Sequence, residues 1–223
     1  MPIPPSSTRP PISKSEAVYR ELRARIIAGR YTAGYRIVLD QIARELGVSP
    51  VPVREAIRRL EAERLVNFTR NVGAEVAGLD VEGYADAMQT LAYLEGAATS
   101  LAADHMSEEL LADARATNQQ LRSVFDAAEF EPRTFTELNA RFHRKLCSAC
   151  PNRHMLDLLE REWEFVAVIR RDGQFRRAQH ALVSVEEHEQ ILDLIAGDVP
   201  RDEIEKAVRD HKMRSMRDLV SGG

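Results

Sequence analysis

The histidines of this 223-residue sequence all lie beyond residue 100, and they are the side chains best suited to metal chemistry. They are His105, His143, His154, His180, His188 and His211. Three of them, His143, His188 and His211, stand on separate predicted helices among apolar neighbours. Imidazole is the commonest protein ligand of divalent transition metals, and helical bundles bring such ligands together in their cores. A buried histidine bonded to a carbonyl is the more frequent arrangement, so the spacing alone leaves both interpretations open.

Cys147 and Cys150 form a CxxC pair, a spacing that also occurs in zinc and redox sites. One pair without a second is not a zinc ribbon, and no predicted strand precedes it, so we expect packed thiols. Two cysteines in the whole sequence also exclude a secreted scaffold held by several disulfides. The cytoplasm is therefore the expected compartment.

A second group of side chains is suited to nucleic acid. Residues 1–78 carry 13 Lys and Arg against 8 Asp and Glu, whereas the remainder carries 18 against 27. Arg54 and Arg58 lie four residues apart on one predicted helix, which Ser49 can cap and Pro50 can begin. Arginine can bind guanine through two hydrogen bonds, and helix N-termini hold phosphate. The alternative is a plain helical hairpin whose arginines are solvated.

Positioning these arginines requires a small helical unit, which residues 15–78 are predicted to form. Its predicted elements are a helix that begins at Ser15, a short helix over 39–46, a helix from Ser49-Pro50, and a β-hairpin over 66–76 with Gly73 near its tip. These are the parts of a winged helix-turn-helix, whose second helix enters the DNA major groove. The Pro-rich tail over 1–14 is expected to be disordered.

Positioning the histidines falls to residues 79–223, which are predicted to form an all-α bundle. Helices are expected at about 81–104, 107–128, 132–149, 152–171, 183–197 and 200–219. Their short connections favour antiparallel packing, so the protein is predicted to be mainly α with two domains. No apolar stretch is long enough to span a membrane, and the N-terminus lacks the apolar region of a secretory signal.

The helix-turn-helix segment resembles a known family. The run LGVSPVPVREAIRRLEAE over 46–63, with GYRI over 34–37 and Gly73-Ala74, closely resembles the GntR family of bacterial transcription regulators. The resemblance covers about residues 15–78 and implies that these residues contact double-stranded operator DNA: Arg36, Ser49, Pro50, Val51, Arg54, Arg58, Arg70 and Gly73.

Four positions depart from the family pattern. Pro50 stands where many members have Arg, and Asp40 stands where some members place a DNA-contacting Arg. Both changes are expected to alter the preferred operator. Val38 replaces the usual Ser or Asn cap of the short helix, which leaves Asp40 to support its first turn. Arg64 replaces the usual Gly, so we expect a non-Gly residue with positive φ at this helix end.

Residues 79–220 resemble the FCD ligand-binding domain of FadR-type GntR regulators. The resemblance implies that one divalent metal ion, zinc or nickel, lies beside a pocket for a small carboxylate effector. Its implied ligands are Asn139, His143, His188 and His211. Asn139 replaces the Asp of metal-binding members and brings an amide oxygen without a charge. Because the imidazoles must be neutral, metal binding is expected to weaken as the pH falls through about 6.5.

The effector pocket implied by this resemblance has a further departure. Leu91, in the sequence LAYLE, stands where many members have Arg in an RxxLE motif. If that Arg holds the effector carboxylate, this protein needs another cation or a different effector. Arg170 and Arg171 are candidates for that cation.

The combined interpretation is a homodimeric DNA-binding regulator, expected to be a repressor that a small organic acid controls, and not an enzyme. One alternative is a metal-dependent enzyme that uses the three histidines, with Glu187 or Glu189 as general base. That activity would leave residues 15–78 without a role. A second alternative is a DNA-binding dimer whose bundle binds no effector.

Overall fold

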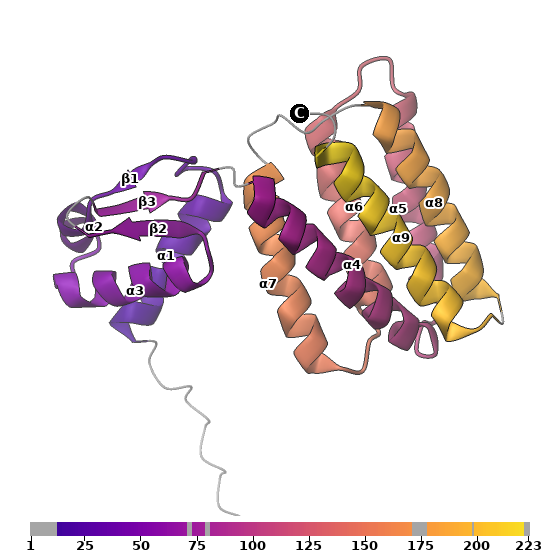
Figure 1. The fold of residues 1–223 in the computed structure, drawn as a ribbon, viewed down its shortest axis with the longest axis horizontal. Coiled ribbons are helices and arrows are strands. Elements are labelled where there is room, and N and C mark those ends of the chain that lie inside the picture. Colours follow the sequence, from indigo (N-terminus) through magenta and orange to yellow (C-terminus); the bar gives the residue numbers. More distant parts are fainter. Residues whose placement is uncertain (1–12, 71–72, 79–80, 171–177, 198, 221–223) are drawn as a thin grey trace, which may run out of the picture. The chain divides into compact units, whose positions relative to one another are not determined.

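The computed structural model describes residues 13–70, 73–78, 81–170, 178–197 and 199–220, and the chain divides into two compact units after Gly78 (Figure 1). None of the described helices is both long enough and apolar enough to cross a lipid bilayer. The predicted disordered tail lies outside the described residues, apart from Ser13 and Lys14. The Ser13 side chain accepts a hydrogen bond from the backbone N–H of Glu16, so the first helix is capped there and begins at Lys14.

The N-terminal unit combines three helices with a small antiparallel sheet. Its elements are α1 (Lys14–Ile27), β1 (Arg36–Ile37), α2 (Leu39–Glu45), α3 (Pro50–Ala62), β2 (Val66–Thr69) and β3 (Gly73–Val76). The strand order is β1-β3-β2, and β2 and β3 form the predicted hairpin. The apolar stripes of α1 and α3 pack together, with Leu22, Ile26, Ile57 and Leu60 fully buried. The winged helix-turn-helix fold is therefore confirmed.

Several local details of this unit agree with the sequence predictions, and others differ from them. The strand β1 was not predicted, because two residues are too few to show an alternating pattern. Ser49 is the N-cap residue of α3 as predicted, but its side chain does not make the expected capping hydrogen bond. Pro50 occupies the first turn of α3 as expected. Arg64 has a φ of 57°, which confirms the predicted left-handed residue at this helix end.

The C-terminal unit is built from helices in every described part, which confirms its all-α class. They are α4 (Val81–Ala103), α5 (Glu108–Asp126), α6 (Pro132–Cys147), α7 (Arg153–Arg170), α8 (Ala178–Ala196) and α9 (Arg201–Val220). Each corresponds to a predicted helix, and α8 begins five residues earlier than expected. One buried cluster includes Tyr84, Met88 and Leu159 from α4 and α7. A second includes residues of α5, α6 and α8, with Phe142 among them.

The last helix, α9, runs beside both α4 and α8 and contributes to both clusters (Figure 1). Its backbone comes very close to α4. A Cβ atom added to Gly96 would lie 2.9 Å from the carbonyl oxygen of Glu205, so only glycine fits at this contact. This packing presents the inner face of α9 toward α6 and α8, where the three histidines lie.

Candidate metal centre and nucleic-acid interface

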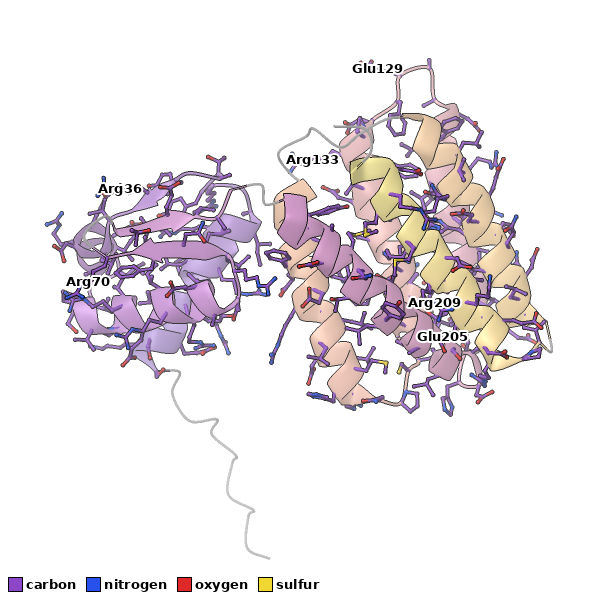
Figure 2. All side chains as sticks on the ribbon, viewed as in Figure 1. Arg36, Arg70, Glu129, Arg133, Glu205 and Arg209 are labelled. Atoms are coloured by element: carbon purple, nitrogen blue, oxygen red, sulfur yellow. The ribbon has the colours of Figure 1, made fainter. Side chains whose placement is uncertain are left out.

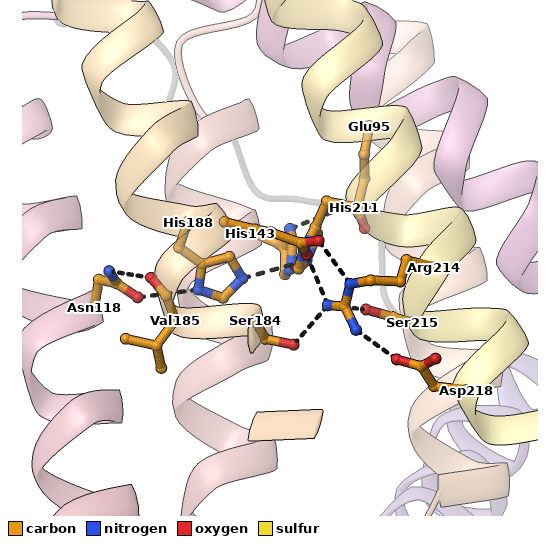
Figure 3. A network of polar contacts seen from close by, with 11 residues as sticks. Glu95, Asn118, His143, Ser184, Val185, His188, His211, Arg214, Ser215 and Asp218 are labelled. Atoms are coloured by element: carbon orange, nitrogen blue, oxygen red, sulfur yellow. Dashed lines mark hydrogen bonds and ion pairs between the residues drawn. The ribbon is translucent and has the colours of Figure 1, made fainter. Parts of the chain in front are cut away.

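His143 on α6, His188 on α8 and His211 on α9 meet in the interior of the bundle (Figure 3). Their side chains are almost completely buried, with exposed fractions of 2%, 0% and 4%. The Nε2 atom of His211 lies 3.3 Å from Nε2 of His188 and 3.4 Å from Nε2 of His143. Residues that are far apart in the sequence therefore direct the same ring atom to one point.

The opposite ring nitrogens of two histidines face hydrogen-bond acceptors. Nδ1 of His188 lies 3.0 Å from Oδ1 of Asn118 on α5. Nδ1 of His211 lies 2.6 Å from a carboxylate oxygen of Glu187 on α8. That carboxylate also accepts two hydrogen bonds of 2.7 Å from the guanidinium of Arg214. Both contacts favour a ring proton on Nδ1, which would leave a lone pair on each Nε2.

His143 is backed by a buried carboxylate. Its Nδ1 lies 3.0 Å from Oε2 of Glu95, which is fully buried. The other oxygen, Oε1, lies 2.8 Å from Nζ of Lys212 and accepts a 2.6 Å hydrogen bond from the indole N–H of Trp163. Oε2 itself has no well-aligned hydrogen bond. The His143 contact is therefore an electrostatic one, and it too favours a proton on Nδ1.

Burial keeps the three histidines neutral at physiological pH. It lowers the pKa of each ring, that of His143 to about 4 and that of His188 well below its usual value. The Lys212 ammonium adds to the shift, whereas Glu187 partly opposes it at His211. Neutral imidazole is the form that binds a metal, so three acceptor atoms converge where a cation would satisfy them.

Glu95 and Glu187 are the carboxylates in contact with the histidine cluster. Burial alone would raise the pKa of Glu95, but Lys212 and His143 lower it well below its usual range. Burial would also raise the pKa of Glu187, but hydrogen bonds from His211 and Arg214 lower it to about 2. Both carboxylates are therefore ionised, and each is paired with a basic side chain.

Asn139 and Leu91, which depart from the family pattern, lie on α6 and α4. Asn139 lies one turn before His143 on α6; its side chain is half-buried and makes no hydrogen bond or ion pair with the described residues. Its predicted metal contact stays a prediction. Leu91 is buried in the apolar cluster of α4 and α7, and the cation beside Glu95 comes from Lys212 on α9 instead. The alternative cations, Arg170 and Arg171, have side chains outside the described residues.

The carboxylates suggested as catalytic bases are both engaged. Glu187 is bound to His211 and Arg214, as described above. Glu189 forms an ion pair with Arg115 and accepts a hydrogen bond from Asn118. Neither is available as a general base beside the histidines.

The predicted thiol packing is confirmed. Cys147 and Cys150 are buried free thiols in the cluster of α4 and α7, and burial raises the pKa of Cys147. The Cys147 thiol contacts the hydroxyl of Thr99 at 3.5 Å. These two residues therefore contribute to packing and do not form part of the histidine cluster.

The side chains predicted to contact DNA lie on the surface of the N-terminal unit. The exposed ones are Arg36, Ser49, Pro50, Val51, Arg54, Arg58 and Arg70, and Gly73 is half-buried. Figure 2 labels Arg36 and Arg70 on this surface. Arg54 and Arg58 make no ion pair with the described residues. Arg59, on the same helix, instead binds Glu16 at 2.6 Å. Val51 is 59% exposed, which is unusual for an apolar side chain.

Gly73 has a φ of 113°, a backbone conformation that favours glycine. It begins β3 directly after residues 71 and 72, which lie outside the described part of the chain. The exposed arginines of α3, Arg36 of β1 and Arg70 after β2 thus occupy the same small unit, whereas the histidines belong entirely to the other.

Sequence reasoning did not identify several residues around the histidines. Glu95 was visible only as the last letter of the LAYLE motif, and Lys212 only as a neighbour of His211. Asn118 and Arg214 carried no signal, because nothing in the local pattern of a helix shows which polar residue will face a ring on another helix.

The sequence matches two family descriptions. Residues 14–76 match "Bacterial regulatory proteins, gntR family", and residues 86–213 match "FCD domain". The HTH-type transcriptional repressor GlaR of Escherichia coli is 27% identical over 191 residues, which are 82% of this chain and 84% of that protein. The regulator YdhC of Bacillus subtilis is 31% identical over 144 residues. That match spans 64% of this chain and 63% of YdhC, less than two thirds of its length.

A solved structure has the same fold. It is a transcriptional regulator of the GntR family from Pseudomonas syringae pv. tomato, with 25% identity and a TM-score of 0.51. The match covers 96% of this chain and 89% of that one. The likeness therefore extends over both units of the chain.

Proposed function

The chain belongs to the GntR family of bacterial regulatory proteins, with an FCD domain after its DNA-binding domain, and from this premise we propose that it is a repressor controlled by a small organic acid bound beside a divalent metal ion. It is a DNA-binding transcriptional regulator and not an enzyme. The name of the E. coli relative, a repressor, supports the proposed direction of control. The convergence of three neutral histidines carries the proposal for metal and effector.

The N-terminal unit would bind an operator as part of a homodimer, since two-fold symmetric operators match two-fold symmetric proteins. Arg54 and Arg58 on α3 would enter the major groove of the DNA. Arg36, Arg70 and Gly73 would contact the DNA phosphate backbone near the sheet. The exposed Ser49 hydroxyl makes no capping bond, so it is available to a phosphate at the start of α3.

The metal ion would be held by His143, His188 and His211 through Nε2, with zinc or nickel as the expected ions. Asn139 is the proposed fourth ligand, through its amide oxygen. When bound, the metal would act as a Lewis acid that holds an anionic group of the effector. The residues of this chain would position that ion and exclude water around it.

The charges at the site favour an anionic effector. The proposed ligands are all neutral, so they leave both positive charges of the ion uncompensated. Glu95 is paired with Lys212 and Glu187 with Arg214, so these two carboxylates are already largely compensated. A carboxylate from the effector would therefore gain strongly from binding the ion in this buried site.

Replacing Asn139 with Asp tests the fourth ligand. The added negative charge should tighten metal binding by about tenfold, or about 1.4 kcal/mol, and weaken an anionic effector that touches the ion. Calorimetric titrations of the metal and then of the effector measure both changes. Unchanged affinities would place residue 139 outside the metal's ligands.

The experiment that tests the function as a whole begins with operators selected from genomic DNA by the purified full-length chain. DNA binding is then measured with and without zinc or nickel, across a panel of small carboxylates. We expect about one ion per chain, and release of DNA by one class of acid only when the metal is present. His188→Ala should lose both the metal and this response but retain DNA binding.

The alternatives give other results. A protein that binds metal and DNA but responds to no acid would be a DNA-binding dimer without effector control. In another outcome, the unmodified protein holds no metal and His188→Ala binds DNA as well as the unmodified protein does. That result would show that the histidines serve only to pack the bundle.

A further inference from the structure

The three histidine rings share one orientation relative to the centre of their cluster. Each ring directs Nε2 inward and Nδ1 outward, and each Nδ1 meets a different acceptor. These acceptors come from three helices: Glu95 from α4, Asn118 from α5 and Glu187 from α8. A neutral imidazole has one proton, and the nitrogen that carries it decides whether Nε2 can bind a metal.

Only one orientation of the Asn118 side-chain amide suits its neighbours. Its Nδ2 donates hydrogen bonds of 3.0 Å to the carbonyl of Val185 and 3.2 Å to Oε2 of Glu189. Both partners are acceptors, so the amide nitrogen must face them and the amide oxygen must face His188. Arg115 holds Glu189 by an ion pair on its other side. The oxygen beside Nδ1 of His188 is therefore fixed as an acceptor.

Glu187 is fixed in a comparable way. Arg214 contacts both of its oxygens and also donates to Ser184 and to Asp218. These contacts hold the carboxylate in the plane where Oε2 meets Nδ1 of His211. Glu95 is fixed by Lys212 and Trp163, which leaves Oε2 directed at His143.

We propose that Glu95, Asn118 and Glu187 are positioning residues that hold His143, His188 and His211 in the Nδ1–H tautomer, so that three Nε2 lone pairs converge before any metal binds. The proposal deepens the proposed function and rests on it for its consequence in metal binding. Groups that orient metal-binding histidines in this way typically change metal affinity by 10- to 100-fold.

The tautomers can be measured directly in the metal-free protein. Full-length chain labelled with ¹⁵N at histidine and treated with a chelator is examined at pH 7.5 by long-range ¹H–¹⁵N correlation. We expect Nδ1–H for all three histidines. In Asn118→Leu, His188 should lose this state while His143 and His211 keep it. An Nε2–H tautomer at His188 in the unmodified chain would overturn the proposal.

Metal affinity provides the second measurement, with Co²⁺ and Zn²⁺ as probes. Asn118→Leu should weaken binding by about 10- to 100-fold, because His188 loses the acceptor that keeps its ring proton on Nδ1. Thr117→Val is the matched control. Thr117 is the buried neighbour on α5, bonded to Asp113 and Lys145 but to no histidine. An equal loss of affinity in Asn118→Leu and Thr117→Val would reduce Asn118 to a structural role.

A second pair of variants tests the proposal even if Asn118→Leu does not fold. Glu187→Gln keeps an acceptor for His211 but loses its charge, so binding should weaken by about tenfold. Asp218→Asn changes the other carboxylate on Arg214 and should leave affinity unchanged. Equal affinities of these two variants would contradict the proposal. Correct tautomers without binding of either metal would instead refute the proposed function and leave the ring orientations standing.

Discussion

The buried histidines lie beside two ion pairs, and this environment determines the pKa of each ring. The ring of His143 faces Glu95, whose charge favours protonation, yet burial and Lys212 lower its pKa to about 4. The folded chain therefore takes up protons on these rings less readily than the unfolded chain does. The metal-free protein should lose stability as the pH falls below about 6.5, where unfolded histidines become charged.

The same shifts change the expected pH dependence of metal binding. Ordinary histidines would weaken binding by about fivefold for each ring between pH 6.5 and 5.5, because the neutral fraction falls from about one half to about one tenth. Because the pKa values of the buried rings are lowered, protons should compete little in this range. We expect the dissociation constant for Zn²⁺ to change by less than about tenfold in total, measured by competition with a metal indicator. A loss of Zn²⁺ affinity as steep as that expected for three ordinary imidazoles would contradict this prediction.

Arg54 offers a test of DNA recognition at a single residue. Arg54→Ala should weaken binding to a selected operator by about 1–3 kcal/mol if the guanidinium binds one base through two hydrogen bonds. Fold and oligomeric state should not change, because the side chain is exposed and makes no ion pair with the described residues. Fluorescence anisotropy at fixed salt measures the change.

The matched control for this variant is Arg59→Ala. Arg59 lies on the same helix, but it binds Glu16 and stacks on the ring of Tyr19. Its loss should leave operator preference unaltered. A wild-type affinity for Arg54→Ala would remove Arg54 from base recognition.

Among the elements, the α4–α9 pair has the tightest backbone contact described above. Gly96→Ala would place a Cβ 2.9 Å from the carbonyl oxygen of Glu205, which a backbone atom cannot easily avoid. The two helices should separate slightly, at a cost of about 1–3 kcal/mol in the free energy of unfolding. Because α9 carries His211, metal affinity should fall as well.

Urea unfolding and zinc titration measure these two effects of Gly96→Ala. Gly78→Ala is the control, since a Cβ there would meet no atom within 4 Å. An unchanged midpoint in Gly96→Ala would mean that the helices can adjust without cost.

Periodicity was sufficient to predict the described helices, because each buries one apolar stripe. It failed for β1, which has only two residues and pairs with β3, and for the start of α8, which lies next to residues outside the described part. The three histidines could be singled out from their predicted helices and apolar neighbours, and the family resemblance implied their assignment as metal ligands. Glu95, Asn118 and Lys212 could not be assigned, because their roles depend on which helices become neighbours.

The molecule as a whole divides its tasks between two units, so metal should affect their stabilities differently. At a free zinc concentration of 100 times the dissociation constant, binding stabilises the folded state by about 2.7 kcal/mol. The thermal midpoint of the C-terminal unit should rise by roughly 5–10 °C, and that of the N-terminal unit should stay constant.

Calorimetry of the full chain with zinc or with a chelator separates the two transitions. His188→Ala should abolish the shift. A shift of equal size in both units would show that they unfold together.

The pairing of α4 with α9 also has a consequence for the order in which the protein folds. The two helices are about a hundred residues apart in the sequence, so their contact closes a long loop and is intrinsically slow to form. During synthesis the DNA-binding unit can fold while the bundle still lacks the helix that joins its two clusters. A nascent chain can thus complete its DNA-binding unit before His211 is synthesised, and the proposed control by metal and effector would be the last property that it acquires.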